Sequence, residues 1–359
     1  MYNTRSYGRH KRNDMGKIET MNSNCNCDNN TDNMNIRTFK RSGFIGKLAL
    51  MALAAVLLLP GVVKAQYGGG SGTAASPYLI STEAHLRTLA TNVNNGTSYA
   101  GQYFRLTTDI SMSSSFVPIG SSATNAFSGT FWGDGHTISN LTMTNTTSQR
   151  QGLFGCVRRG WIDSVKVRGT VTGADSTGGI VGSLIYGTVK GCTNYATIAG
   201  SYQCHGGIVG SMYYGRVINC RNEGSNNAVA QYNQGGIVGF ARYASTIRNC
   251  VNVGTISGSS YYHGGIVGHF LGAASALHFV DTVGVFNCIN RGSVTGSYYA
   301  GGIAGRFYYI KHMRNCVNSG TVTGTMYSAG IAGYSYGSSS YHPRFTRCVD
   351  SGNVTSTSY

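Results

Sequence analysis

The sequence predicts an all-β protein, a right-handed parallel β-helix with about 28 residues per coil and an N-terminal capping helix. Three observations indicate this fold. A glycine-bracketed block recurs seven times at nearly constant spacing, a second pattern inside each period alternates as a β-strand does, and one amphipathic segment precedes the repeats. Units of this length cannot bury an apolar face alone, so we expect them to stack on their neighbours.

Each block consists of two apolar residues between two glycines. Successive blocks start 27, 28, 29, 29, 37 and 28 residues apart. The longest interval contains extra residues around Leu271 to Thr282, which we expect to form a loop that leaves the stack undisturbed. The seven blocks are Gly152–Gly155, Gly179–Gly182, Gly207–Gly210, Gly236–Gly239, Gly265–Gly268, Gly302–Gly305 and Gly330–Gly333.

The second pattern predicts interior columns of like side chains. Within each period an apolar residue is followed by Cys three positions later, by Asn or Asp two positions after the Cys, and then by alternating small and β-branched residues. This spacing suits three short strands per coil, with equivalent residues of successive coils about 4.8 Å apart. The predicted columns are Val165, Cys192, Cys220, Cys250, Cys288, Cys316 and Cys348, and Asn194, Asn222, Asn252, Asn290, Asn318 and Asp350.

We interpret both columns as structural. Because Val165 occupies the register of the cysteines, that position accepts a small buried hydrophobic group, and we expect inert thiols rather than a metal or disulfide framework. The Asn column is expected to form an amide ladder in which each side chain bonds to its counterparts above and below, with Val167 as an apolar first member. Cys156 and Cys204 lie outside the column and could form disulfides in an exported chain.

The blocks resemble the GLUG motif, named for Gly, Leu, a variable residue and Gly. Segments before the blocks also resemble the region that opens proteins with this motif. These segments are Gly72–Glu83, Leu86–Asn95, Tyr103–Ile110, Phe127–Phe131 and Gly135–Ile138. The resemblance implies a secreted or surface-attached bacterial protein, often large and adhesin-like, and the motif also occurs beside peptidase domains of the immunoglobulin-A protease type. This chain has no H-E-x-x-H pair, so we do not expect that zinc peptidase here.

Residues 34–65 are predicted to form a secretory signal peptide. Basic residues beginning at Arg37 precede the continuous apolar run Leu48–Leu59, and small residues lead to a cleavage site after Ala65. The run is shorter than the roughly 20 residues of a membrane-spanning helix, which makes a retained anchor the second interpretation. We therefore expect a mature chain without a transmembrane span, either secreted or at the cell surface.

The other predicted segments are an unstructured extension at 1–33, with the true start of translation near Met34, the cap and first coils at 66–150, and the repeat β-helix at 151–359. Ser81 is expected to cap a helix from Thr82 to about Val93 that covers the exposed backbone edge of the first coil. At the other end no block follows Asn353–Tyr359. That end is expected to be covered by self-association or another chain, or to be truncated.

The composition does not favour catalysis, a cofactor or a metal site. From Gln66 onward the chain has 18 Lys plus Arg and 8 Asp plus Glu, and no two of these acids lie within ten residues of each other. A pair of catalytic carboxylates would have to come from adjacent coils, such as Asp134 with Asp163 or Asp163 with Asp175. The Asn column offers neutral amides, which are poor calcium ligands.

Aromatic rows and a basic stripe are the candidate binding surfaces. The basic stripe consists of Lys190, Arg248 and Arg314, which share one outward position two residues before the Cys. His205 and His263, just before Gly-Gly pairs, are expected to be polar surface residues. We expect the tyrosines to contact sugar rings or another protein, unless they only brace the turns. The row ahead of the blocks is Tyr202, Tyr232, Tyr261, Tyr262, Tyr298, Tyr299 and Tyr327. The row after the blocks is Tyr186, Tyr213, Tyr214, Tyr243, Phe270, Phe307, Tyr308, Tyr334 and Tyr336.

The resulting hypothesis is a secreted or surface-exposed bacterial binding and adhesion module that contacts glycans or surface proteins. Two alternatives remain open at this point. One is an enzyme of the polysaccharide lyase or hydrolase class, and the other is a structural spacer or a remnant of a larger adhesin. Nucleic acid is the least favoured partner, because an exported chain without a recognised binding fold has little reason to meet it.

Overall fold

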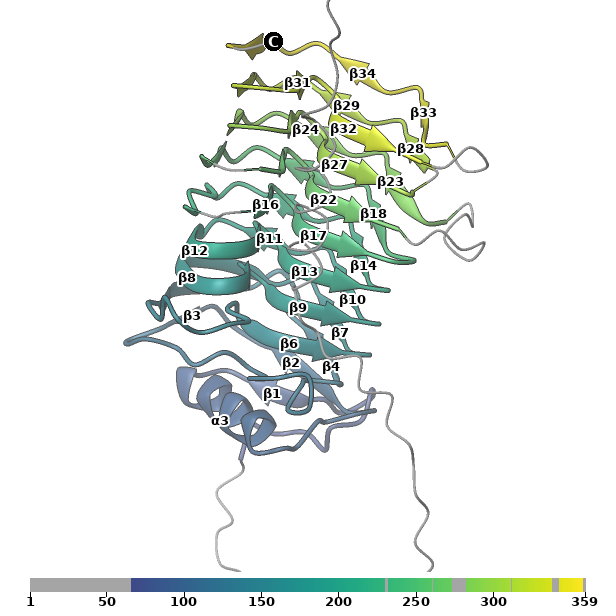
Figure 1. Ribbon diagram of the computed structural model, residues 1–359. Helices are drawn as coiled ribbons and strands as arrows, with labels where there is room; N and C mark the ends of the chain where they lie inside the picture. Colours follow the sequence, from purple (N-terminus) through teal and green to yellow (C-terminus); the bar gives the residue numbers. More distant parts are fainter. Residues whose placement is uncertain are drawn as a thin grey trace, which may run out of the picture.

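The chain folds into a parallel β-solenoid. The computed structural model describes residues 66–229, 232–259, 261–272, 282–310, 312–337 and 342–357. Successive turns stack along one axis, and the helix α3 (Glu83–Asn94) lies at the N-terminal end of the stack (Figure 1). The predicted all-β parallel β-helix is thereby confirmed. The segments 1–33 and 34–65 and the centre of the expected loop after Leu271 lie outside the described residues.

Four parallel sheets make up the described part of the solenoid. Sheet A contains β1 (Tyr78–Ile80), β2 (Tyr103–Leu106), β4 (Thr130–Trp132), β7 (Trp161–Asp163), β10 (Thr188–Lys190), β14 (Arg216–Ile218), β18 (Thr246–Arg248), β23 (Gly284–Phe286), β28 (His312–Arg314) and β33 (Arg344–Thr346). Sheet C contains β6 (Phe154–Arg158), β9 (Val181–Ile185), β13 (Val209–Tyr213), β17 (Val238–Arg242), β22 (Val267–Leu271), β27 (Ala304–Tyr308) and β32 (Ala332–Tyr336).

Sheet B is the largest and uses two segments of most turns. It contains β3 (Ile110–Ser111), β5 (Thr137–Met143), β8 (Lys166–Gly178), β11 (Thr193–Asn194), β12 (Thr197–Gly206), β15 (Arg221–Asn222), β16 (Tyr232–Gly235), β19 (Val251–Asn252), β21 (His263–Gly264), β24 (Ile289–Asn290), β26 (Ala300–Gly301), β29 (Val317–Asn318), β31 (Ser328–Ala329) and β34 (Val349–Asp350). Sheet D contains β20 (Ile256–Ser257), β25 (Val294–Gly296), β30 (Val322–Gly324) and β35 (Val354–Ser356).

A turn contains more strands than the sequence predicted. The turn from Val267 to Gly301 uses the five strands β22 to β26, each of two to five residues, where we expected three per coil. The reason is a sharp corner in every turn between sheets A and B. One residue there adopts a left-handed backbone with φ between 52° and 62°, at Ser164, Gly191, Asn219, Asn249, Asn287, Asn315 and Arg347. Asn and Gly tolerate this conformation well, so the chain can bend within one residue.

The long interval between blocks leaves the stack in register, as expected. Strand β22 ends at Leu271 and β23 begins at Gly284. Thr246 of β18 still pairs with Gly284, and Ile247 with Val285, in the same order as in the neighbouring turns. The extra residues therefore enter between sheets C and A without displacing either sheet.

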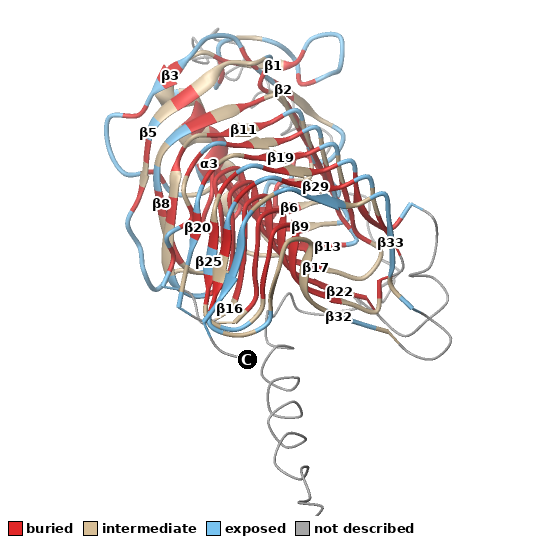
Figure 2. Cartoon of the chain, turned by 90° about the horizontal axis from the view of Figure 1, so that it is seen from above, coloured by how far each residue is buried: buried red, intermediate tan, exposed pale blue. Residues whose placement is uncertain are grey.

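The core fills the centre of the stack from end to end. Seen along the axis, buried residues line the inside of each turn and exposed residues lie outside (Figure 2). The apolar residue after the first block glycine is fully buried at Ile180, Ile208, Ile237, Ile266 and Ile303. A single hydrophobic cluster includes these residues, the inward residues of sheet A and the buried face of α3.

The block glycines are required by close approach. A Cβ atom added at Gly207 or Gly236 would overlap the side chain of Asn222 or Asn252. The second glycine of a block meets backbone instead, since a Cβ atom at Gly210 would overlap the main chain at Ser176. Glycine at these positions therefore lets the chain approach a buried asparagine side chain and the backbone of neighbouring turns closely.

Helix α3 covers the first turn as expected, but its cap differs by one residue. Thr82, not Ser81, is the N-cap, because its backbone is extended and its hydroxyl accepts a hydrogen bond from the His85 amide at 3.2 Å. Leu86, Leu89, Ala90 and Val93 are the buried residues of the helix. The face predicted from the sequence therefore packs on the end of the core.

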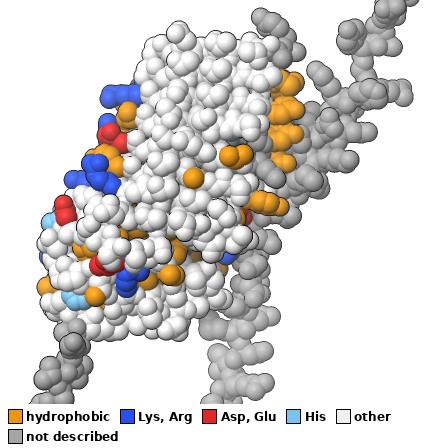
Figure 3. All heavy atoms as spheres, turned by 90° about the vertical axis from the view of Figure 1, so that its left-hand side faces the viewer, with side chains coloured by type: hydrophobic (Ala, Val, Ile, Leu, Met, Phe, Trp, Pro, Cys, Tyr) orange, Lys and Arg blue, Asp and Glu red, His pale blue; other side chains and the backbone are white. Residues whose placement is uncertain are grey.

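The exterior is mostly uncharged. On the face shown in Figure 3, charged side chains gather along one margin and most of the surface is backbone or uncharged polar side chains. This agrees with the low content of charged residues, 11% of the chain. In the last described turn, strands β33 to β35 are exposed along their length, including Phe345, Val349 and Val354.

Candidate ligand-binding surfaces

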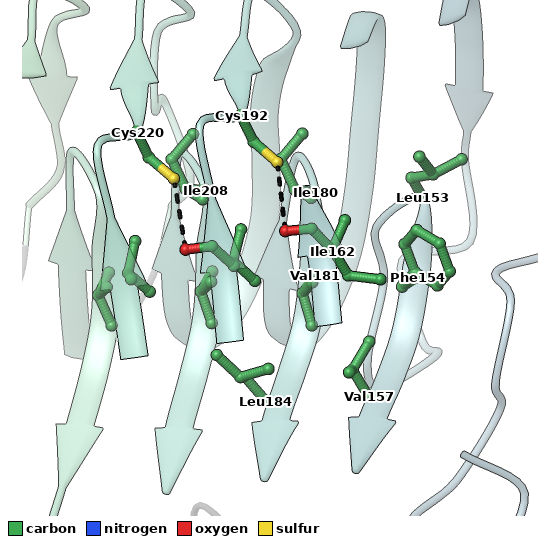
Figure 4. Close-up of a cluster of buried hydrophobic side chains, with 14 of the residues drawn as sticks. Leu153, Phe154, Val157, Ile162, Ile180, Val181, Leu184, Cys192, Ile208 and Cys220 are labelled. Atoms are coloured by element: carbon green, nitrogen blue, oxygen red, sulfur yellow. Dashed lines mark hydrogen bonds between the residues drawn. The ribbon is translucent and has the colours of Figure 1, made fainter. Parts of the chain in front are cut away.

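The cysteine column is interior and continuous. Strand pairing aligns Val189 with Ile162 of the preceding turn and with Val217 of the next turn. It likewise aligns Asn194 with Val167 and Asn222. Cys192 lies between these two aligned positions, so Val165, Cys192 and Cys220 share one register. Each thiol points at a carbonyl of the preceding turn, as Cys192 Sγ does with Ile162 O at 3.9 Å and Cys220 Sγ with Val189 O at 3.7 Å (Figure 4). All six column cysteines are free thiols.

Two of these thiols, Cys220 and Cys288, are poorly suited to nucleophilic chemistry. Burial raises the pKa of Cys220 and Cys288 well above the ordinary range, which keeps both thiols protonated. Outside the column, Cys156 and Cys204 are both fully buried, and the Asn233 amide lies 3.6 Å from the Cys204 sulfur. Within the described part of the chain, no group of three or more His, Cys, Asp or Glu residues could hold a metal ion.

The asparagine column is a hydrogen-bonded ladder. Each Nδ2 donates to the Oδ1 of the next member at 2.8 Å, from Asn194 through Asn222, Asn252, Asn290 and Asn318 to Asp350. Each Nδ2 also donates to the backbone carbonyl two residues later in its own turn, so Asn252 bonds Gly254 O at 2.9 Å. Val167 pairs with Asn194 at the first position. The column therefore joins five successive gaps between turns.

The tyrosines ahead of the blocks form two stacks. The first tyrosine stack comprises Tyr232, Tyr261 and Tyr298, with ring centroids 5.1 and 4.5 Å apart and interplanar angles of 13° and 16°. The second comprises Tyr262, Tyr299 and Tyr327, with centroids 5.4 and 5.1 Å apart. Tyr298 and Tyr327 are exposed, as is Tyr202, whereas Tyr262 is buried.

The row after the blocks is divided between surface and core. Tyr186, Tyr214 and Tyr243 form a third tyrosine stack, with centroids 4.8 and 4.9 Å apart. Phe270 and Phe307 instead point into the core, and Tyr213 is buried, so these three do not belong to the expected surface row. The strand register explains this, because Phe270 and Phe307 continue the inward position of Leu184, Met212 and Ala241.

The basic stripe is a sparse row on sheet A. Register places Ile218 between Lys190 and Arg248, and Phe286 between Arg248 and Arg314. Successive charges are thus two strand spacings, about 9.6 Å, apart. Lys190 Nζ lies 3.8 Å from the Asp163 carboxylate, and the Arg248 guanidinium stacks 4.6 Å from the Phe286 ring centre. Charges this far apart are largely screened in saline solution.

The histidines before the Gly-Gly pairs are buried, which corrects the expectation of polar surface residues. His205, Gln234 and His263 follow one another in adjacent strands β12, β16 and β21 of sheet B. Burial lowers the pKa of His205 to about 3 and that of His263 to about 4. Neither ring nitrogen of His205 has a hydrogen-bond partner among the described residues. Both histidines border the core, because the second glycine after each, Gly207 or Gly265, packs closely against a buried side chain of the asparagine column, Asn222 or Asn290.

Of the acidic pairs considered from the sequence, the fold brings one together. Asp134 and Asp163 line the same open pocket on sheet A, whereas Asp175 lies on β8 of sheet B.

No helix in the described part of the chain is long and apolar enough to cross a membrane.

No protein-family model matches the chain. Halomucin of Haloquadratum walsbyi is 32% identical over 144 residues, which cover 37% of this chain and 2% of that protein. A Gly-rich membrane protein of Evansella cellulosilytica is 33% identical over 136 residues, covering 34% of this chain and 15% of that protein. The chain therefore corresponds to a small part of either relative.

The solenoid also resembles a solved structure, that of a candidate immunoglobulin A1 protease from Bacteroides ovatus. The TM-score is 0.51 and the identity 19%, over 81% of this chain and 80% of that chain. At this identity the similarity shows a shared fold and nothing about activity.

Proposed function

We propose that this protein is an exported, surface-exposed binding module that contacts glycan chains along the side of its solenoid. The observation that carries the proposal is the regular stacking of tyrosines, of which Tyr298 and Tyr327 are exposed, on an exterior with few charges. The matches to Halomucin and to a Gly-rich membrane protein support a surface location, as does the signal peptide predicted at 34–65.

The stacks suggest how contact would be made. Parallel rings about 5 Å apart cover one another's faces, so a sugar ring cannot lie flat on an inner tyrosine. The stack instead offers its outer edge, where phenol hydroxyl groups recur once per turn and can each donate and accept a hydrogen bond. A row of identical groups fits a partner whose polar groups also repeat, as in a polysaccharide.

The role of the hydroxyl groups can be separated from that of the stack. We expect the combined substitutions Tyr202→Phe, Tyr298→Phe and Tyr327→Phe to reduce retention on a polysaccharide array at least tenfold, because Phe keeps the ring but cannot hydrogen-bond. Far-UV circular dichroism should not change. Tyr186→Phe with Tyr214→Phe tests the exposed members of the third stack in the same way. Retention unchanged by all five substitutions would contradict the proposal and leave the tyrosines with a bracing role.

A further inference from the structure

An open pocket lies on the outer face of sheet A, near the N-terminal end of the solenoid. It has a volume of about 620 Å³, within the range of small-molecule sites. Strands β2, β4 and β7 and the corners after β4, β7 and β10 supply the walls. The lining residues are Arg105, Trp132, Asp134, Gly135, Asp163, Ser164 and Gly191.

The charges around this pocket cancel in pairs. Arg105 Nε lies 3.2 Å from Asp134 Oδ2, and Lys190 Nζ lies 3.8 Å from Asp163 Oδ2. Asp163 also accepts hydrogen bonds from Ser164 Oγ at 2.6 Å and from Trp161 Nε1 at 3.2 Å. Because neither carboxylate is left without a cation nearby, the pocket has no net charge to attract an ion. Each carboxylate oxygen nevertheless keeps a lone pair that can accept from a hydroxyl group.

An aromatic surface is part of the same pocket. The guanidinium of Arg105 lies 5.1 Å from the Trp132 ring centre and Tyr103 packs at 5.2 Å, which holds the indole in place. Trp161 is on the next strand and is exposed. These are the two tryptophans of the chain. An indole beside carboxylates and a hydroxyl combines an apolar platform with hydrogen-bond acceptors, which suits a ligand with one apolar face and a polar rim.

The pocket is open because one corner residue lacks a side chain. In the corner between sheets A and B, Asn219, Asn249, Asn287 and Asn315 form an outer row, joined by hydrogen bonds of 2.9 to 3.0 Å. Gly191 occupies the same corner one turn before Asn219, with φ of 62° against 56° for Asn219. A Cβ atom at Gly191 would lie 2.9 Å from Ser164 Oγ and 3.4 Å from Asp163 Oδ1, and so would point into the pocket.

We infer that this pocket binds a single neutral sugar ring. The apolar face of a pyranose would pack against the part of Trp132 that lines the pocket, beside Arg105 and Tyr103, while its hydroxyl groups donate to Asp134 and Asp163. The site lies apart from the tyrosine stacks and does not depend on them. The cancelled charges argue against uronic acids and sulfated sugars, because an added anion would meet two carboxylates already paired with their cations.

Tryptophan fluorescence of the full chain tests this directly, since Trp132 lines the site and the indole of Trp161 donates a hydrogen bond to Asp163. We expect titration with methyl pyranosides of glucose, galactose and mannose to give a saturable change for at least one of them, in the millimolar range typical of a single sugar. The corresponding methyl glucuronide should bind at least tenfold more weakly. No saturable change with any neutral pyranoside, or equal binding of the uronide, would overturn the inference.

Gly191→Asn closes the pocket while suiting the backbone, because Asn adopts this left-handed conformation at Asn219. We expect it to abolish the fluorescence change and to leave the melting temperature within a few degrees of the parent. Asn315→Gly, at the same corner several turns away, is the matched control and should bind as the parent does. Binding by Gly191→Asn equal to that of the control would refute the site. The tyrosine-to-phenylalanine variants should retain this titration, so failure of the stacks and failure of the pocket can be distinguished.

Discussion

At the scale of single residues, burial reverses what residue type suggests. His205 and His263 are polar and lie next to turns, yet both are buried, and burial depresses the pKa of each imidazole because the charged form loses its hydration. His269 of β22 is likewise fully buried, with its pKa well below the ordinary value. The neutral forms of these histidines are therefore part of the folded state.

This gives a pH dependence with a definite sign. The unfolded chain binds protons at His205 and His263 near pH 6.5, whereas the folded chain binds them there only near pH 3 and pH 4, respectively. Between those values the unfolded state holds more protons, so the free energy of unfolding falls as pH decreases, by up to about 1.4 kcal/mol per pH unit for each histidine. Urea denaturation at pH 7.0, 6.0, 5.0 and 4.5 measures this change in the free energy of unfolding.

His205→Gln is the variant for comparison, because Gln234 occupies the adjacent position of the same column. Without the titrating imidazole, the free energy of unfolding should depend less steeply on pH below 6.5. An identical slope in parent and variant would show that His205 is not protonated on unfolding in this range.

At the scale of elements, the fold is stabilised by columns of equivalent residues in successive turns rather than by long strands. Most strands are two to five residues long, too short to be stable alone, and each is held by equivalent residues above and below it. The asparagine ladder is one example of this stabilisation, since every Nδ2 donates one hydrogen bond within its own turn and one to the next turn. The alternation of the sequence predicted this column, because residues spaced by two share a face of a strand.

Asn252 is the central member and the most informative to replace. We expect Asn252→Ala to lower the free energy of unfolding by about 2–5 kcal/mol, because it leaves Asn222 Nδ2 and Asn290 Oδ1 without this buried partner. Asn249→Gly removes a member of the exposed outer row and suits the left-handed backbone there, so it should change stability by less than about 1 kcal/mol. Equal effects in denaturant titrations would show that the ladder contributes nothing beyond the corner row.

At the scale of the whole molecule, the two ends of the stack differ. Helix α3 closes one end with an apolar face that belongs to the main core. The last described turn is more open, and its strands β33 to β35 are exposed where their partners in the preceding turn, β28 to β30, are half-buried or buried. In a stacked array each turn is stabilised mainly by its neighbours, so stability should vary along the axis.

Hydrogen exchange followed by mass spectrometry should detect this gradient. We expect amides of β33 to β35 to exchange at least tenfold faster than those of the central strands β14, β18 and β19, since local opening is easiest where few apolar contacts are lost. Uniform protection of amides from exchange along the axis would contradict the predicted gradient. It would indicate that the solenoid opens as one cooperative unit.

The amino-acid sequence alone determined the stacking, the period, the two interior columns and the buried face of the helix. All of these follow from the local alternation of residue types and the regular recurrence of the repeat, which do not depend on how individual side chains pack. It could not place Phe270 and Phe307 in the core, identify the buried histidines or count the strands in a turn, because these depend on where each corner bends the chain. The pocket is the clearest case. Trp132, Asp163 and Gly191 lie in three successive turns, and only the register between those turns makes them neighbours.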